Sequence, residues 1–292
     1  MHIDTMIRTF CRALIVATCG AALALPALAD SRSVPLGDGN VSTRPLRDNV
    51  FSCETSFRPR PEGAAERSFP WISGDIWYPD EKPFLAGNVI WSEGGSQVTV
   101  SGSIRRITSS GVPDHGTGNF PIRPTDPMYQ YDRNPNEVAT HRLVMELPAS
   151  PQLAARPSCL PMGPIGVALS GATIFNALDA AGLDAAAHEI QDECKGHPAR
   201  RGQYHYHSGS DCMASTKAAA DGHSGLVGYA GDGFGIFGPL GDTGVALTNA
   251  DLDACHGHQG PVQWDGKEVV TYHYHITAEY PYTLGCFIGI PQ

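Results

Sequence analysis

Residues 204–207 read Tyr-His-Tyr-His, and the same four residues return at 272–275. Each copy follows a segment of the pattern D-x-C-x-G-H, at Asp192–His197 and at Asp253–His258. A further cysteine follows each copy, and nine of the twelve histidines fall between His188 and His275. Chance does not readily give this order of chemical groups twice, so the repeat marks where the chemistry of the chain is expected.

Each YHYH copy is expected to be a β-strand, in which successive side chains point to opposite faces. His205 and His207 then share one face, and so do His273 and His275 in the second copy. Two imidazoles at positions i and i+2 on one face can close on a single metal ion. The tyrosines on the other face favour strands and can anchor them on the core.

A third histidine precedes each strand, so each repeat offers three imidazoles, enough for a site with a vacant position. Alternatively, the two copies pair about a pseudo-twofold axis and share one site. Imidazole ligands suit several transition metals and affinity alone favours copper, so the predicted cofactor and partner is a copper or zinc ion. The predicted ligands are His205, His207, His273 and His275, followed by His197 and His258.

Other roles remain open for these residues. The histidines and tyrosines can instead form a hydrogen-bond network that holds buried strands in an exported structural or adhesive protein. Asp192 and Asp253 can orient an imidazole or cap a turn. A metal-dependent hydrolase or oxidase needs an open coordination position and a base such as Asp232, although Asp before Gly is more often a turn residue. Since no catalytic residue is identified, the sequence does not decide whether the chain is an enzyme.

The first 29 residues have the pattern of a signal peptide, with Arg8 and Arg12 before an apolar run and Ala27-Leu28-Ala29 as the cleavage site. The apolar run of thirteen residues is too short to span a bilayer. We therefore expect a periplasmic or secreted protein that is not inserted in a membrane after cleavage. The formal net charge of −10 argues against nucleic acid as a partner.

Six cysteines follow the predicted cleavage site, an even number that favours disulfide bonds in an oxidising compartment. The repeat pairs Cys194 with Cys212 and Cys255 with Cys286, which leaves Cys53 with Cys159. A bond between the repeats, Cys194 with Cys255, is the competing arrangement.

The predicted fold is mainly β or α+β, an antiparallel β body with one or two helices and disulfide bonds. Residues 30–70 form an extended N-terminal arm, and residues 71–292 form the β-rich domain. The expected strands are Ser73–Tyr78, Gly87–Trp91, Gln97–Ile107 and His141–Leu147, and the expected helix is Ile174–Glu193. Residues 233–238 match G-x-G-x-x-G, but Pro239 and Gly241 follow where a helix should begin, so no nucleotide cofactor is expected.

These residues resemble the YHYH domain, a family of exported bacterial proteins. The resemblance includes Gly111–His115, both repeats, the glycine-rich segment Asp232–Gly238 and the segment Pro281–Cys286. It covers about residues 95–292 and implies export and one YHYH domain. The family has no settled biochemical activity, so the resemblance adds no reaction. The chain departs from the family at Gly235-Ile236-Phe237, where Pro-Ile-Tyr is more usual.

Overall fold

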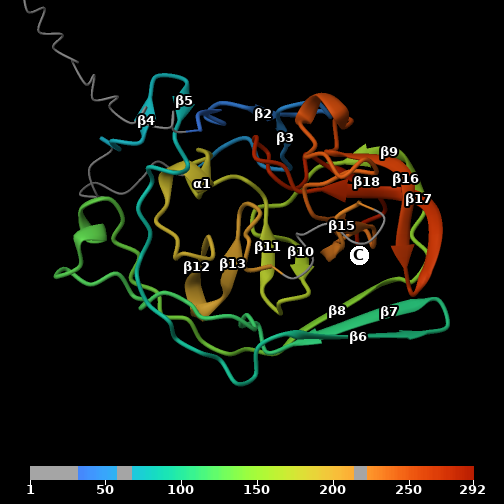
Figure 1. Cartoon of the computed structure of the whole chain (residues 1–292), viewed down its shortest axis with the longest axis horizontal. Helices are drawn as coiled ribbons and strands as arrows, with labels where there is room; N and C mark the ends of the chain where they lie inside the picture. Colours follow the sequence, from blue (N-terminus) through green and yellow to red (C-terminus); the bar gives the residue numbers. More distant parts are fainter. Residues whose placement is uncertain (1–31, 58–67, 214–221) are drawn as a thin grey trace, which may run out of the picture. The chain divides into compact units, whose positions relative to one another are not determined.

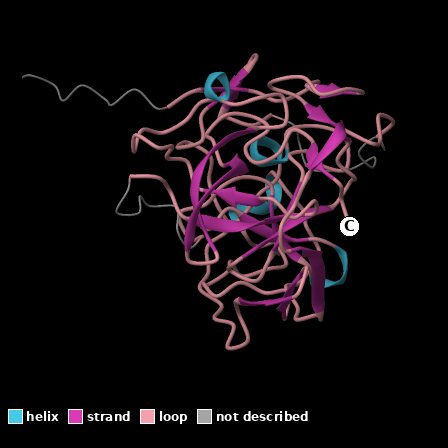
Figure 2. Ribbon diagram, turned by 90° about the vertical axis from the view of Figure 1, so that its right-hand side faces the viewer, coloured by secondary structure: helices cyan, strands magenta, loops and turns pink. Residues whose placement is uncertain are grey.

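The computed structural model describes residues 32–57, 68–213 and 222–292, and the predicted signal peptide lies outside these residues. The described residues belong to one compact unit. Its regular structure is mostly strand (Figure 2), and the one α-helix of the described part is α1, Ala185–His188. The expectation of a mainly β fold is therefore confirmed.

Eight strands form the largest sheet, in the order β12-β13-β11-β10-β14-β15-β17-β16 (Figure 1). Only the pairs β11–β13 and β15–β17 of this sheet are parallel. The strands are β10 Pro164–Ala168, β11 Thr173–Phe175, β12 Gly196–Pro198, β13 Tyr204–Tyr206, β14 Leu226–Ala230, β15 Gly235–Phe237, β16 Gly257–Trp264 and β17 Lys267–His275.

The two halves of this sheet have the same order of strands, counted outward from the centre. Strand β10 matches β14, β11 matches β15, β13 matches β17 and β12 matches β16. The centre is the antiparallel pair β10–β14, which relates the two halves by a pseudo-twofold axis. Turns between the strands match too: Leu178 bridges Asp184, and 62 residues later Leu240 bridges Ala246. The repeated unit therefore extends beyond the YHYH segments to a whole four-strand half.

Smaller sheets and short turns of 3-10 helix surround the eight strands. The sheet β6-β7-β8 lies along the bottom of Figure 1. The smaller strands are β1 Val34–Pro35, β2 Val41–Ser42, β3 Val50–Phe51, β4 Ile72–Ser73, β5 Ile76–Trp77, β6 Ser96–Ser101, β7 Ile104–Ser109, β8 Leu143–Pro148, β9 Leu153–Ser158 and β18 Phe287–Gly289. The 3-10 turns are η1 Pro127–Gln130, η2 Arg200–Gly202 and η3 Asn249–Asp251.

Each D-x-C-x-G-H segment forms the same tight turn before its histidine strand. The Asp192 N–H donates to the Gly196 carbonyl over 2.9 Å, and the Asp253 N–H donates to the Gly257 carbonyl over the same distance. The glycine is required by packing, because a Cβ at Gly196 would lie 2.2 Å from the Tyr204 ring. The segment thus turns the chain and lets the following tyrosine pack across it.

Three disulfide bonds join the cysteines in the arrangement that the repeat favours. The bonds are Cys53–Cys159, Cys194–Cys212 and Cys255–Cys286. The competing bond between the repeats does not form. The bond Cys53–Cys159 joins the chain just after β3 to the chain just after β9. Strand β1 also pairs with β5. The N-terminal residues are therefore joined to the body by a covalent bond and by hydrogen bonds.

The helix expected at Ile174–Glu193 is wrong. Its first two residues belong to β11, and the side chains of Asn176 and Asp179 then accept hydrogen bonds from the N–H groups of Leu178, Ala181 and Leu183. These local bonds compete with the helical ones. Only the four residues of α1 are helical, and they begin after the N-cap Asp184.

Two of the four expected strands are hairpins instead. Ser73–Tyr78 is interrupted by a turn at Gly74, and Gln97–Ile107 by a turn at Gly102, both glycines having φ near +60°. Within Gly87–Trp91 only a bridge at Val89 forms, whereas the strand expected at His141–Leu147 is confirmed as β8.

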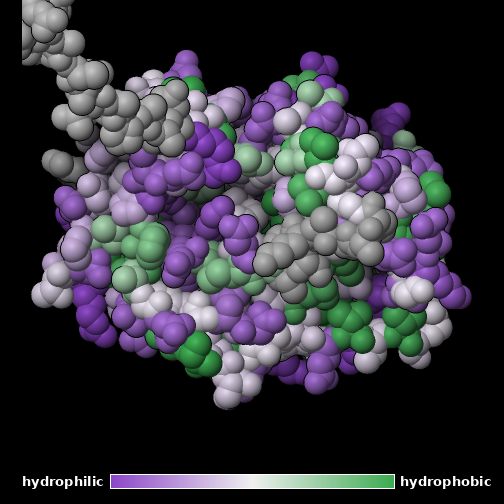
Figure 3. Space-filling model, viewed as in Figure 1, coloured by the Kyte–Doolittle hydropathy of each residue, from purple (hydrophilic) through white to green (hydrophobic). Residues whose placement is uncertain are grey.

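The face shown in Figure 3 mixes hydrophilic and hydrophobic side chains. Among the described residues, none of the helices is long and apolar enough to cross a membrane.

We predict that Gly196→Ala lowers the free energy of unfolding by about 2 kcal/mol or more, because the added methyl group overlaps the buried Tyr204 ring. Urea denaturation of the variant and the wild type measures the difference. Gly260→Ala is the control, since its Cβ would lie 3.4 Å from the nearest atom, and it should cost less than about 1 kcal/mol. Equal costs for the two variants would contradict the packing argument.

Candidate metal centres

The first half of the sheet gathers three histidines, His197, His205 and His207, which we call cluster 1. His197 on β12 lies directly opposite His205 on β13, and cross-strand neighbours of this kind are close enough for their side chains to touch. His207 follows two residues later on the same face. The Nε2 atoms of His205 and His207 are 3.0 Å apart, and all three side chains are buried.

Main-chain carbonyls fix two rings of cluster 1. Nδ1 of His207 lies 2.6 Å from the Asn176 carbonyl oxygen, and Nδ1 of His205 lies 3.2 Å from that of Gln203. A carbonyl oxygen only accepts, so each Nδ1 carries the proton and each Nε2 keeps a lone pair. The ring of Phe175 stacks on His205 at 3.8 Å between centroids, which shields this side of the cluster from water.

A carboxylate lies at the edge of cluster 1. Oε2 of Glu189, the residue after α1, is 3.4 Å from Nε2 of His197 and 3.4 Å from Nε2 of His207. His197 is 3% exposed, and neither of its ring nitrogens has a hydrogen-bond partner among the described residues. A buried imidazole in this state costs free energy unless a further group binds it.

The second half gathers four histidines, His223, His258, His273 and His275, which we call cluster 2. His258 on β16 lies opposite His273 on β17, the same register as in the first half. Nε2 of His258 lies 3.0 Å from that of His273 and 3.1 Å from that of His275. Nε2 of His223 lies 3.3 Å from that of His273.

The rings of cluster 2 are fixed in the same way. Nδ1 of His275 lies 2.7 Å from the Gly238 carbonyl oxygen, the position that corresponds to Asn176 in the first half. Nδ1 of His273 faces the Thr271 carbonyl at 3.2 Å, and Nδ1 of His223 faces the Ser224 carbonyl at 2.6 Å. These Nε2 lone pairs therefore also converge.

Burial favours the neutral form of the imidazoles on the two YHYH strands and of His197. It lowers the pKa of His207 to about 4, of His273 to about 3 and of His275 to about 2. It also lowers the pKa of His197 and His205 well below the ordinary value, and neighbouring imidazoles add to the effect. Neutral rings with free Nε2 lone pairs are the form that binds a metal ion.

The spacing of the ring nitrogens fits one ion in each cluster. Zinc–nitrogen bonds of about 2.0–2.1 Å place two ligand nitrogens of a tetrahedron about 3.3–3.4 Å apart. The Nε2 atoms of His205 and His207 in cluster 1 are 3.0 Å apart, and neighbouring Nε2 atoms of cluster 2 are 3.0 to 3.3 Å apart. The carbonyls that hold Nδ1 are the outer partners that metal-bound histidines ordinarily have.

All six histidines predicted from the sequence lie in these clusters, three in each. His205 and His207 belong to one and His273 and His275 to the other, so the alternative of a single shared site is wrong. The sequence analysis missed His223 and Glu189, which lie outside the repeated frame. The sequence does contain a pattern that indicates the larger repeat. Gly171 lies three residues before Ile174-Phe175, and Gly233 lies three residues before Ile236-Phe237.

The tyrosine faces of the two strands point away from the clusters and bind acidic groups. The Tyr204 hydroxyl donates to Asp192 and the Tyr272 hydroxyl donates to Asp253, both over 2.9 Å. These aspartates also accept the N–H of the glycine in each frame. Of the two roles considered for Asp192 and Asp253, the structure shows the turn cap and not contact with an imidazole.

Asp232 is also on a tyrosine face. Its carboxylate accepts the Tyr274 hydroxyl over 2.6 Å and the Gly289 N–H over 2.9 Å. Tyrosine and histidine side chains alternate along β17, so Asp232 lies on the other side of this strand from cluster 2. The suggestion that Asp232 is a base beside the histidines is therefore wrong.

Four described histidines lie outside the clusters, at positions 115, 141, 188 and 256, and two of them contact the YHYH segments. The His256 ring contacts the His275 and Thr283 carbonyls and the Asn249 and Thr277 side chains, each within 3.0 Å. His115 Nε2 lies 2.6 Å from the Tyr206 hydroxyl. His115 also lies near Cys194 and Cys212, but these sulfur atoms form a disulfide bond and are not available as thiolates.

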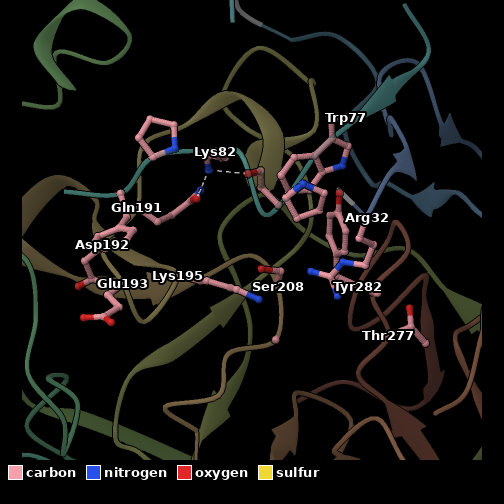
Figure 4. Close-up of a pocket in the computed structure, with 16 residues that line it drawn as sticks. Arg32, Trp77, Lys82, Gln191, Asp192, Glu193, Lys195, Ser208, Thr277 and Tyr282 are labelled. Atoms are coloured by element: carbon pink, nitrogen blue, oxygen red, sulfur yellow. Dashed lines mark hydrogen bonds between the residues drawn. The ribbon is translucent and has the colours of Figure 1, made fainter. Parts of the chain in front are cut away.

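A cavity of about 170 Å³ opens beside the first half of the sheet (Figure 4), and no cluster histidine lines it. Lys82 enters it and donates to the Ala186 carbonyl and to the Gln191 side chain. Ser208, which follows His207 directly, forms part of the wall. Burial lowers the pKa of Lys82 to about 7. Because no cluster histidine lines this cavity, it is a neighbour of cluster 1 and not the cluster itself.

Comparison with known families gives one match. Residues 144–246 match the family model described as YHYH protein, so the chain contains the YHYH domain that the sequence resembles. The matched span includes cluster 1 and His223, and it ends before the second D-x-C-x-G-H and YHYH segments. No curated protein matches the chain, and no solved structure matches it.

We predict that in the metal-free protein at neutral pH the rings of His205, His207, His273 and His275 are neutral and protonated at Nδ1. The reason is that each Nδ1 faces a carbonyl oxygen. Long-range proton–nitrogen NMR spectra of the ring nitrogens distinguish the two neutral tautomers and the cation. Spectra showing the proton on Nε2, or charged rings, would contradict the arrangement.

Proposed function

We propose that this YHYH-domain protein binds transition-metal ions, copper or zinc, at its two histidine clusters. The observation that carries the proposal is the convergence of buried Nε2 lone pairs whose rings are already fixed through Nδ1. Each cluster comes from one half of the sheet, so the chain is expected to bind two ions. The metal is the partner that this geometry supports.

The main competitor is a hydrogen-bond network that only stabilises the strands. Such a network needs a donor between two facing nitrogens. Nδ1 already carries the proton of His207 and His275, and burial opposes a second proton on the ring. Two lone pairs about 3 Å apart repel unless an ion lies between them. A bound metal removes this repulsion, so metal binding accounts for both clusters better.

A role in binding or delivery is favoured over catalysis. The hydrolase or oxidase alternative needs an open coordination position and a base such as Asp232, and Asp232 lies on the tyrosine face. The donors in cluster 2 are all imidazoles, a set that suits both copper and zinc. The geometry therefore supports a metal-binding protein without assigning it a reaction.

We further propose that residues 1–29 are removed on export and that the protein works in the periplasm or outside the cell. Three disulfide bonds support this, since they form and persist in oxidising compartments. The working unit is then the β-rich domain at 71–292 together with the arm at 30–70, which supplies Cys53.

We predict that protein purified after export contains close to two equivalents of copper or zinc. The double variants His205→Ala/His207→Ala and His273→Ala/His275→Ala should each retain close to one, because each removes two ligands from a single cluster. Plasma mass spectrometry of the folded proteins measures the content, after reconstitution with either metal where it was lost in purification.

His115→Asn is the control, since His115 lies on the tyrosine face and its loss should leave the metal content unchanged. A folded wild-type protein that binds neither metal would overturn the proposal and favour a structural role for the histidines. Loss of both ions in either double variant would contradict two independent sites.

A further inference from the structure

We infer that Glu189 is the fourth ligand of cluster 1, so that the chain holds two chemically different metal sites. One site has three imidazoles and a carboxylate, and the other has four imidazoles. This inference rests on the proposed function and goes beyond it, because it assigns a ligand that is not a histidine and a distinct donor set to each half.

The position of Glu189 is that of a ligand in a four-coordinate site. Its Oε2 is 3.4 Å from the Nε2 atoms of both His197 and His207. This equals the separation of two ligand atoms around a tetrahedral ion, about 3.3–3.4 Å for bonds of about 2.0–2.1 Å. One oxygen that stands at this distance from two imidazole nitrogens can bind the same ion as both of them and does not merely cap one ring.

His197 supplies an independent observation. Its ring is 3% exposed, and neither nitrogen has a hydrogen-bond partner among the described residues. A neutral imidazole buried in this way gains free energy when a further group binds its lone pair. An ion held between Nε2 of His197 and Oε2 of Glu189 satisfies that lone pair.

The backbone places Glu189 without a flexible loop. Asp184 caps the start of α1, and Glu189 ends the helix by donating its N–H to the Ala185 carbonyl. The next residue, Ile190, is fully buried and donates its N–H to Asp132. The carboxylate is thus attached to a fixed segment, which lowers the entropy that is lost when it binds an ion.

Lys82 offers a competing explanation for Glu189. The electrostatic influence of Lys82 reaches Glu189, His197 and His207. The ammonium group, however, donates to Ala186 and Gln191. If Glu189 only balanced the charge of Lys82, its replacement by glutamine would change the affinity for metal through charge alone and leave the ligand set and the absorption bands of the bound ion unaltered. The two roles are therefore separable.

The second half has no carboxylate in the corresponding place. Glu189 lies three residues before Asp192, and the residue three before Asp253 is Ala250. The nearest carboxylate in this part of the chain is that of Asp251, the next residue. Asp251 is turned outward and accepts from the N–H and the hydroxyl of Thr248. The fourth group of cluster 2 is instead His223. The half-exposed side chain of Asp242 places its Oδ1 4.0 Å from Nε2 of His223. The two halves thus share three histidines and differ in the fourth donor.

This difference has chemical consequences. A carboxylate offsets one of the two charges of a buried divalent ion, whereas four neutral imidazoles offset none. Carboxylate oxygen also suits harder ions than imidazole does. Cluster 1 should therefore hold a divalent ion such as zinc or cobalt more strongly through Glu189, and cluster 2 should show the spectrum of an all-nitrogen site.

Cobalt(II) titration of the exported, chelator-treated protein tests the assignment, with visible absorption and a competing chelator as readouts. Wild-type protein should bind two ions. Glu189→Gln should weaken one of them at least tenfold and shift its absorption bands, while the other ion keeps its affinity and spectrum. Asp242→Asn and Asp251→Asn are matched controls, which should leave the ion in cluster 1 unchanged.

If Glu189→Gln does not fold, X-ray absorption on zinc-loaded His273→Ala/His275→Ala, in which only cluster 1 remains, gives the same information. Three imidazoles and one oxygen from the protein are expected there, and three imidazoles without a carboxylate would overturn the inference. Two bound cobalt ions with unaltered affinities in Glu189→Gln would also overturn it and leave the proposed function standing. If the wild-type protein binds no cobalt, zinc or copper, the proposed function itself fails.

Discussion

The structure depends on one constraint, which is that the histidine rings of the two YHYH strands are held through Nδ1 by main-chain carbonyls. For His207 and His275 the carbonyl belongs to the residue that follows the neighbouring parallel strand, Asn176 and Gly238 respectively. The tautomer of the ring is therefore set by the pairing of the sheet itself. With Nδ1 occupied, the Nε2 lone pair of each ring faces the other rings of its cluster.

The parallel pairs β11–β13 and β15–β17 are needed for this arrangement. Parallel strands require a long connection between them. The connection in each half contains the D-x-C-x-G-H turn, which places His197 opposite His205 and His258 opposite His273. A disulfide bond then closes each half. The same order of strand, turn and strand in both halves explains why the chemical groups recur in order while the spacers between them differ in length.

Much of this could be predicted from the sequence, because the informative features are local. Alternation along YHYH predicted the two faces, and the repeat predicted the pairing of the cysteines. For the histidines the repeat left two groupings open, and one of them, three histidines from each repeat, is the one observed. The helix at 174–193 was wrong because side-chain bonds from Asn176 and Asp179 favour turns over helix, which a hydrophobic pattern does not reveal. Asp232 was misplaced because the face that a loop residue reaches depends on the hairpin between β14 and β15.

The fourth donors could not have been predicted for a different reason. Glu189 and His223 come from connections, and nothing in the repeated frame specifies them. The frame itself is constrained on both sides, by the Tyr204–Asp192 and Tyr272–Asp253 bonds on one face and by the imidazoles on the other. A substitution within the frame would disturb a buried carboxylate or a buried imidazole. A substitution in a connection would alter only the fourth side chain that lies beside the three histidines. The two halves can therefore share three histidines and still differ in the fourth donor. That donor is a carboxylate, Glu189, directly after α1 in the first half and an imidazole, His223, before β14 in the second.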